Sequence, residues 1–467
     1  MIHNNTYWKC RITLNGLSKV FWTLILLSAV LPVRGQQSAQ DFFQEGIVKV
    51  RSANYLGAIQ DFSKVLALSP SHAPSYFNRG LAKASLKDYS GAITDYDQAI
   101  ELDPGVALYY DSRGVSKSLR YDYKGAVLDY TKAIERDPEQ AITFYNRAVS
   151  LVKLNNLKKA LPDFNTSLEL QPDYVPALYA RGNCYQDLGN YAASLADFSR
   201  VITLSPKRTG AYGGRGLAKL ELGDYQGAID DFTKALSLNP NESWYHNNRG
   251  MARLRLKDFT AAIADYNKTI SLDPANYHAF YGRGYARSQL NDQSGAIKDY
   301  NRAIEIKNKF LKTSQNNHPG KSNKTESKID QDRLNSLRDL VKVEFEIKEL
   351  SNDRAEAYYM RGISQYRLGK EKTAMTDFTR AIELDPYLAQ AFYYRALLHS
   401  RNKDQYSAIH DLTSALKITP YFAEALYLRG IFQLYLGMEA EGCYDLSISG
   451  SMNFAPAYKI IESYCDN

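Results

Sequence analysis

The chain has 467 residues, of which 44% are hydrophobic and 23% charged, and its formal net charge is +7. This hydrophobic content supports a large buried interior and excludes a disordered chain, while the length exceeds what one ordinary core holds. The first 35 residues carry four basic side chains and no acid, which leaves 54 basic against 51 acidic residues beyond them. That near balance argues against nucleic acid as a partner.

Residues 1–35 have the pattern of a secretory signal peptide. Basic residues precede an apolar run over 20–33, and Val33 and Gly35 are small enough for the −3 and −1 positions of a cleavage site. The run is shorter than the roughly 18 to 20 apolar residues that span a bilayer. We expect a mature chain from about Gln36, without a membrane span, in the periplasm, elsewhere in the envelope, or secreted. An uncleaved anchor is the alternative.

Prolines then recur every 34 residues, a period typical of a repeat array. They are Pro70, Pro104, Pro138, Pro172, Pro206, Pro240 and Pro274, and Pro386 and Pro420 resume the spacing. Eight repeats are predicted over 36–308 and three over 353–454. We number each repeat so that its small residue, such as Gly80, is position 8. Position 20 is then usually alanine and position 24 usually aromatic, as in Ala92 and Tyr96, and these two lie on one helical face. Each repeat is expected to form two antiparallel helices that end before the proline.

The repeat YFNRGLAKASLKDYSGAITDYDQAIELDP resembles a tetratricopeptide repeat, and the similarity covers residues 37–454. It implies an all-α, right-handed superhelical solenoid whose first helices line a concave groove, with residues 455–467 as a capping helix. Arginine replaces the apolar residue that usually precedes the glycine. The tail GCYDLSISGSMNFAPAYKIIESYC resembles the closing segment of exported repeat proteins from bacteria of the Bacteroidetes type.

Residues 309–352 interrupt the array. From 307 to 328 they carry six lysines against one glutamate, a composition typical of a linker. Apolar residues at helical spacing then predict a helix over about 329–350. Two interpretations stay open for the insertion: a basic arm for an acidic partner or anionic lipid, and a solvated loop.

Arginine occupies position 7 in ten repeats, and aspartate occupies position 23 in all eleven. Because charges next to a packed face need partners, we expect a structural ladder. The first repeat has Glu45 at position 7, so pairing within a repeat would oppose two acids. The prediction is therefore that each aspartate pairs with the arginine of the following repeat. The first members of this ladder are Asp61, Arg79, Asp95, Arg113, Asp129 and Arg147.

The resemblance places positions 2, 5, 6, 9, 12 and 13 along the groove. Position 5 is tyrosine in six repeats and is Asp111 or Asn247 in two others. Tyrosine offers apolar area and a hydroxyl, which suits a bound polypeptide, whereas the alternative is that these rings only pack on one another. The predicted groove residues are Tyr145, Tyr179, Asn183, Arg255, Tyr281, Tyr285, Tyr359, Arg367, Tyr393, Arg401 and Tyr427. The family's carboxylate clamp is not predicted, because Tyr179 stands in place of its lysine and Gly214 in place of its second asparagine.

No nucleophile, acid–base pair, phosphate loop or metal-ligand spacing is recognisable, so no catalytic residue, cofactor or metal is predicted. Cys443 and Cys465 are each 11 residues from Phe454, near a predicted helix turn, and two interpretations stay open: a disulfide and two free thiols. The expected function is a non-catalytic scaffold that binds protein partners at the cell envelope. The alternative is an accessory protein that binds glycan or a cell-wall polymer for an envelope assembly machine.

Overall fold

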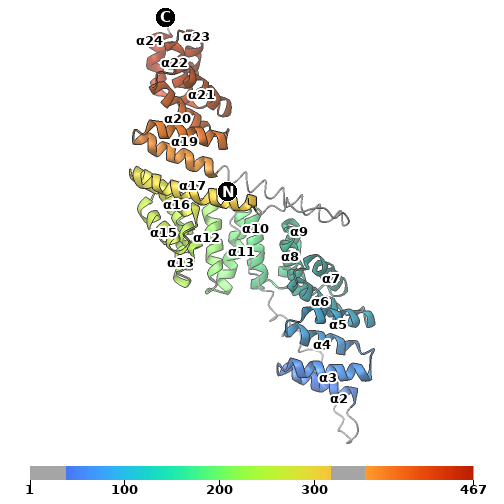
Figure 1. Cartoon of the computed structure of the whole chain (residues 1–467). Coiled ribbons are helices and arrows are strands. Elements are labelled where there is room, and N and C mark those ends of the chain that lie inside the picture. Colours follow the sequence, from blue (N-terminus) through green and yellow to red (C-terminus); the bar gives the residue numbers. More distant parts are fainter. Residues whose placement is uncertain (1–37, 317–352, 466–467) are drawn as a thin grey trace. The chain divides into compact units, whose positions relative to one another are not determined.

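The computed structural model describes residues 38–316 and 353–465, and within these ranges it consists of helices and short connections without a strand (Figure 1). The expected signal peptide at 1–35 and the expected helix at 329–350 lie outside the described residues. The chain divides between Lys234 and Ala235 into two compact parts. We call them the N-terminal and the C-terminal part and describe each by itself.

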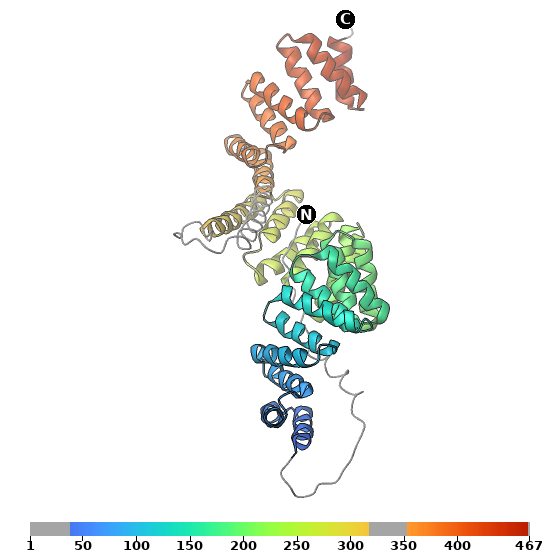
Figure 2. The same cartoon turned by 90° about the vertical axis from the view of Figure 1, so that its right-hand side faces the viewer.

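The N-terminal part is a succession of helix pairs. The pairs are α2 (Ala39–Arg51) with α3 (Tyr55–Leu68), α4 (Ala73–Ser85) with α5 (Tyr89–Leu102), α6 (Ala107–Leu119) with α7 (Tyr123–Arg136), α8 (Ala141–Lys153) with α9 (Leu157–Leu170), α10 (Val175–Asp187) with α11 (Tyr191–Leu204), and α12 (Thr209–Glu221) with α13 (Tyr225–Leu238). In both views, the two helices of a pair lie side by side (Figures 1 and 2).

The C-terminal part continues in the same way. Its helices are α14 (Ser243–Arg255), α15 (Phe259–Leu272), α16 (Tyr277–Gln289), α17 (Gln293–Asn316), a helix over 353–367, α19 (Glu371–Leu384), α20 (Ala389–Arg401), α21 (Gln405–Ile418), α22 (Ala423–Tyr435), α23 (Glu439–Ser451) and α24 (Ala455–Tyr464). The last of these is a single helix beside α23, as expected of a cap.

Local sequence explains the turn inside each repeat. Position 15 adopts a positive φ in every repeat, as at Lys87 (64°) and Gly189 (75°), and this reverses the chain after the first helix. An aspartate or asparagine usually follows at position 16 and caps the second helix. Asp88, for example, accepts a hydrogen bond of 2.9 Å from the backbone N–H of Gly91.

The core of each repeat forms between its two helices. The alanine at position 20 and the aromatic ring at position 24 are fully buried, as in Ala92 and Tyr96. A side chain on Gly80 would place its Cβ only 2.6 Å from the ring of Tyr96, so position 8 must be small where the helices cross. First helices also contact the first helices of neighbouring repeats, for example α4 with α6 and α14 with α16. They therefore form one continuous face within each part.

The repeats on either side of the insertion stack directly on each other. Asp353 accepts hydrogen bonds of 2.6 Å from the Tyr277 hydroxyl and from Lys307 Nζ. Arg361 donates to Asn301 over 2.6 Å, and Arg367 donates to Ser288 over 3.2 Å. The repeats before and after the insertion are therefore in contact. The predicted linker does not begin at residue 309, because α17 continues as a helix to Asn316.

A disulfide fastens the C-terminal end. It joins Cys443 of α23 to Cys465, directly after α24, with Cα atoms 5.6 Å apart. Cys184 is the free cysteine of the described residues, and it is buried in α10.

Candidate functional site

The arginines at position 7 hold the aspartates of their own repeats. In all ten repeats with this arginine, Nε and Nη2 donate to the two oxygens of the aspartate 16 residues later, and the Nη2–Oδ1 distances are 2.5–2.9 Å. Arg79 thus pairs with Asp95, and Arg113 with Asp129. Our prediction of pairing between repeats was wrong. It assumed that position 7 supplies the only cation, whereas Lys49 at position 11 pairs with Asp61 in the first repeat.

A basic side chain at position 11, four residues after position 7, is common. The residues at position 11 that pair with the aspartate are Lys49, Lys83, Lys117, Lys219, Arg253, Arg287 and His399. Position 11 is Leu151 in the fourth repeat and Tyr185 in the fifth, so Asp163 and Asp197 lack this second cation. Sequence reasoning missed these residues, although lysine or arginine four residues after the arginine was visible in five repeats.

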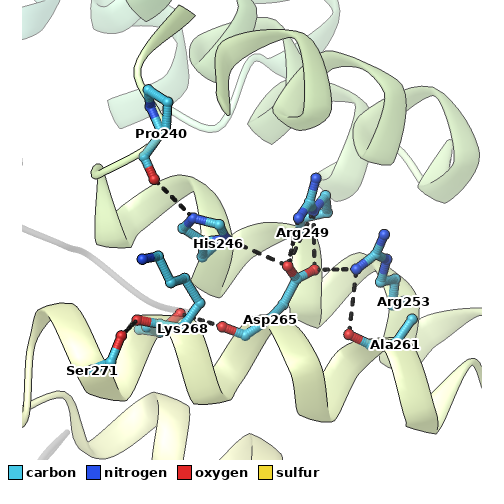
Figure 3. Close-up of polar contacts among 9 residues, drawn as sticks. Pro240, His246, Arg249, Arg253, Ala261, Asp265, Lys268 and Ser271 are labelled. Carbon is cyan, nitrogen blue, oxygen red and sulfur yellow. Dashed lines mark hydrogen bonds and ion pairs between the residues drawn. The ribbon is translucent and has the colours of Figure 1, made fainter. Parts of the chain in front are cut away.

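Figure 3 shows the aspartate with the most partners. Asp265 accepts from Arg249, from Arg253 over 2.6 Å, and from His246 Nδ1 at 3.5 Å. Burial raises the pKa of Asp265, but the hydrogen bonds from His246 and Arg249 and the charges of Arg249 and Arg253 outweigh burial and hold the pKa below its usual value. Asp265 is therefore a charged structural group, without the raised pKa that a general acid needs.

The third guanidinium nitrogen is what reaches the preceding repeat. In nine repeats Nη1 of the arginine donates to the side chain at position 25 of the repeat before it. The acceptors are Ser63, Asp97, Thr131, Asn165, Ser199, Asn267, Asn301, Thr379 and Thr413. A link between repeats therefore exists, but it is a single contact of Nη1 and not the main ion pair. Its acceptor is a neutral side chain in eight repeats and a carboxylate, Asp97, in one.

Most of the tyrosines at position 5 pack on core aromatic rings. Their ring centroids lie 5.5–6.2 Å from the ring at position 24 of the same repeat, as in Tyr145 with Phe164, Tyr179 with Phe198, Tyr281 with Tyr300, and Tyr359 with Phe378. Where position 24 is leucine, Tyr393 and Tyr427 instead pack 5.0 Å and 5.2 Å from Phe422 and Phe454.

These tyrosines differ in exposure. Tyr145 is buried, whereas the others are partly exposed on the face of the first helices. Burial raises the pKa of Tyr393 to about 12, helped by the charge of Glu424. Burial also raises the pKa of Tyr281, with further contributions from Glu356. The hydroxyls of Tyr393 and Tyr281 therefore stay protonated and can donate hydrogen bonds at neutral pH.

The other predicted groove residues lie on the same helices. Asn183 donates to the backbone carbonyl of Tyr179 over 2.9 Å, so its amide is used inside α10. Tyr285 is partly buried, with its ring 6.5 Å from Phe259. The predicted arginines are exposed at the ends of first helices: Arg255, Arg367, and Arg401, which pairs with Glu371 at 2.9 Å and lies over the ring of Tyr366.

Within 38–316 and 353–465, no three His, Cys, Asp or Glu side chains are placed to hold a metal ion. Among the helices in these same ranges, none combines the length and the apolar character that crossing a membrane requires.

A succession of antiparallel helix pairs with this recurring packing defines a helical-repeat solenoid. Family models described as tetratricopeptide repeat match residues 73–106, 141–174, 175–208, 210–242, 247–309 and 355–388. The chain is a tetratricopeptide-repeat protein, and this repeat supports a scaffold for protein–protein interaction.

Solved structures of repeat proteins resemble shorter stretches of the chain. YrrB, described as a TPR protein with an unusual peptide-binding site, is 26% identical, covers 39% of this chain and 95% of its own, and has a TM-score of 0.37. The C-terminal part of a TPR repeat-containing protein from Cytophaga hutchinsonii is 19% identical over 51% and 98%, with a TM-score of 0.44. A tetratricopeptide repeat protein from Parabacteroides merdae ATCC 43184 is 19% identical over 58% and 94%, with a TM-score of 0.34. No curated protein matches the sequence.

Proposed function

We propose that this protein is a non-catalytic scaffold that binds a partner polypeptide along the first helices of its C-terminal part. The observation that carries the proposal is a row of four partly exposed tyrosines at position 5 of consecutive repeats: Tyr281, Tyr359, Tyr393 and Tyr427. Their rings are fixed by core aromatics, so little rotamer entropy is lost when a ligand covers them. The exposed guanidinium groups of Arg367 and Arg401 add positive charge beside the row.

We further propose that the protein works at the cell envelope after export. The apolar segment 20–33 supports a signal peptide, and a disulfide between Cys443 and Cys465 is typical of proteins in an oxidising compartment. A fusion of residues 1–60 to alkaline phosphatase, which is active only outside the cytoplasm, tests this point. An inactive fusion that accumulates in the cytoplasm would contradict export.

Site-specific photo-crosslinking in cells tests the binding face. A benzoylphenylalanine residue would replace Arg367 or Arg401 on the first helices, and Lys372 or Thr376 on the exposed side of α19 as matched controls. We expect one polypeptide to be crosslinked from both first-helix positions and not from the controls. Equal crosslinking from all four positions would contradict this face.

The crosslinking variants are preferable to alanine substitutions of the tyrosines. Removing rings that lie 5.0–6.2 Å from core aromatics would damage folding together with binding. If no polypeptide is crosslinked from any position but the chain binds isolated cell-wall polymer, the glycan accessory role replaces the scaffold.

A further inference from the structure

A cavity of about 620 Å³ lies between two neighbouring repeats of the C-terminal part. One wall comes from α19, the second helix of one repeat, and the rest from α20 and α21, which form the next repeat. Its lining includes Met375 and Thr379 of α19, His399 of α20, and Ser407 and His410 of α21. The volume lies within the roughly 300–1,000 Å³ that is typical of sites for small molecules.

Three residues that line this cavity depart from the pattern of the other repeats. Position 11 is histidine only here, as His399, and position 22 is histidine only here, as His410. Position 18 is aromatic only here, as Tyr406, whereas the other ten repeats carry leucine, alanine, lysine or an uncharged polar residue. Since those repeats fold without these side chains, the repeat fold does not require them. Their meeting in one cavity therefore indicates a binding site.

The histidine at position 11 explains why there is space at this place. In five other repeats a lysine or arginine at position 11 reaches the buried aspartate of position 23 over 2.6–2.9 Å. The side chain of His399 is shorter, and its Nε2 stays 3.7 Å from Asp411. Arg395 still holds Asp411 through bonds of 2.7 and 2.8 Å. The aspartate therefore keeps a cation although the long side chain is missing.

The charges around the cavity are paired, which favours an uncharged ligand. Arg395 and Asp411 neutralise each other. Asp404, next to the cavity, lies 3.6 Å from His399 Nδ1 and accepts a hydrogen bond of 3.0 Å from the backbone N–H of Ser407. An anionic ligand would be repelled by the carboxylate of Asp411, and a cationic ligand by the guanidinium of Arg395.

The aromatic and polar groups of the lining suit a sugar ring. Tyr406 is 75% exposed and lies one helical turn from His410, which is also exposed, so its ring offers a flat apolar surface at the edge of the cavity. Thr379, Ser407 and His410 carry groups that donate and accept hydrogen bonds. A sugar ring combines an apolar C–H face with hydroxyl groups that do both, so it can use the tyrosine and the polar lining together.

We propose that this cavity binds an uncharged sugar unit of an oligosaccharide or polysaccharide. Because Tyr406 and His410 leave the cavity open to solvent, the units on either side of the bound one can continue outside it. The site lies against the second helices α19 and α21, whereas the tyrosine row lies on first helices. The inference therefore does not rest on the proposed polypeptide scaffold.

A microarray of neutral and acidic oligosaccharides, probed with the purified chain, tests the proposal. We expect neutral oligosaccharides to be bound, and we would titrate the strongest of them by isothermal calorimetry. Tyr406→Ala and His399→Lys should each weaken this binding by roughly tenfold or more, because the first removes the ring and the second places a long cation in the cavity. Tyr421→Ala removes a ring that is 77% exposed outside the cavity, and it should leave the affinity unchanged.

His399→Lys also keeps the test independent of folding. Lysine at position 11 pairs with the aspartate in other repeats, so this variant should match the parent in circular dichroism. Binding of acidic oligosaccharides alone, no binding of any oligosaccharide, or equal affinity of the parent and His399→Lys would overturn the proposal. Photo-crosslinking from Arg367 and Arg401 reports on the first helices, so failure of the sugar site leaves the scaffold to be judged separately.

Discussion

The buried aspartates at position 23 differ in how many cations they meet. Asp129 pairs with two cations, Arg113 and, at 2.7 Å, Lys117. Asp163 pairs with one cation, Arg147. A buried carboxylate that loses its only cation is far more costly than one that keeps a second. The two repeats therefore form a natural matched pair for mutation.

We predict that Arg147→Ala lowers the free energy of unfolding by about 4 kcal/mol and Arg113→Ala by about half as much. The reason is that Lys117 continues to neutralise Asp129 after Arg113 is removed, while Asp163 is left without a charged partner. Urea unfolding followed by circular dichroism measures both variants. Equal losses would show that the position-11 cation does not compensate for the arginine.

Position 15 offers a second residue-scale test, because its left-handed backbone carries glycine in some repeats and lysine or asparagine in others. Lys87→Gly should stabilise the chain by about 1 kcal/mol, since glycine adopts this conformation without the Cβ clash. Gly189→Ala should destabilise it by about the same amount, and because a Cβ there would meet no atom within 4 Å, only the backbone contributes. Thermal unfolding of both variants checks the opposite signs.

Asp111 gives a pH dependence of opposite sign to that of a paired acid. Burial raises its pKa from 3.8 to about 6, so the folded state binds its proton more tightly than the unfolded state does. This group therefore makes the protein lose stability as the pH rises from about 4 to about 6. Asp111→Asn should stabilise the ligand-free chain more at pH 7.5 than at pH 5.0 in urea unfolding. A constant difference would contradict the raised pKa.

At the scale of elements, the sequence predicted the helix pairs well because each signal acts within one repeat. Position 8 must be small against the ring at position 24, proline ends the second helix, and aspartate or asparagine begins it. Signals within one repeat could not decide which aspartate at position 23 pairs with which arginine at position 7. Glu45 in the first repeat suggested one register, and only the geometry shows that Lys49 replaces the missing arginine.

The candidate groove was less predictable than the fold. The tyrosine row lies on the first helices, but spacing alone could not show that most of the rings pack on the aromatic residue of position 24. Tyr145 and Tyr179 therefore have different exposures despite the same repeat position. The raised pKa of Asp111 was equally invisible, because it results from burial that the repeat spacing does not show.

The disulfide between Cys443 and Cys465 bears on the last element, α24. Its single helix packs on one side only, and the bridge closes a loop of about 20 residues that should be worth about 3 kcal/mol. We predict that the Cys443→Ser, Cys465→Ser double variant loses hydrogen-exchange protection in α24. The oxidised parent should keep this protection, and the reduced parent should resemble the variant. Unchanged exchange would contradict the fastening role.

At the scale of the molecule, the insertion leaves the spacing of the C-terminal part intact. The link from Nη1 of the arginine to position 25 spans 16 residues elsewhere but 60 between Arg361 and Asn301. The difference of 44 is the length of residues 309–352. The array therefore resumes in register after the insertion, and Asp353 and Lys307 meet where the chain would otherwise run straight on.

Deletion of residues 309–352, joining Asn308 to Asp353, should consequently give a folded chain with an uninterrupted repeat. We expect the circular dichroism per residue to be kept and the unfolding transition to lie within a few degrees of that of the parent. A matched deletion of equal length from 321 to 364, which removes Arg361, should abolish folding of the following repeats. Loss of structure in the first variant would show that the inserted residues support the stack.

The ion pairs that close inside each repeat have a consequence for how such a chain can change its length. Since the costly buried carboxylate at position 23 is neutralised by its own repeat, duplicating or losing a whole 34-residue segment breaks none of these buried ion pairs. Only one hydrogen bond to a serine, threonine, asparagine or aspartate must be made anew at the join. Recombination between neighbouring copies within the gene is therefore tolerated by the protein's electrostatics, and ligand specificity can be gained or lost in steps of one repeat.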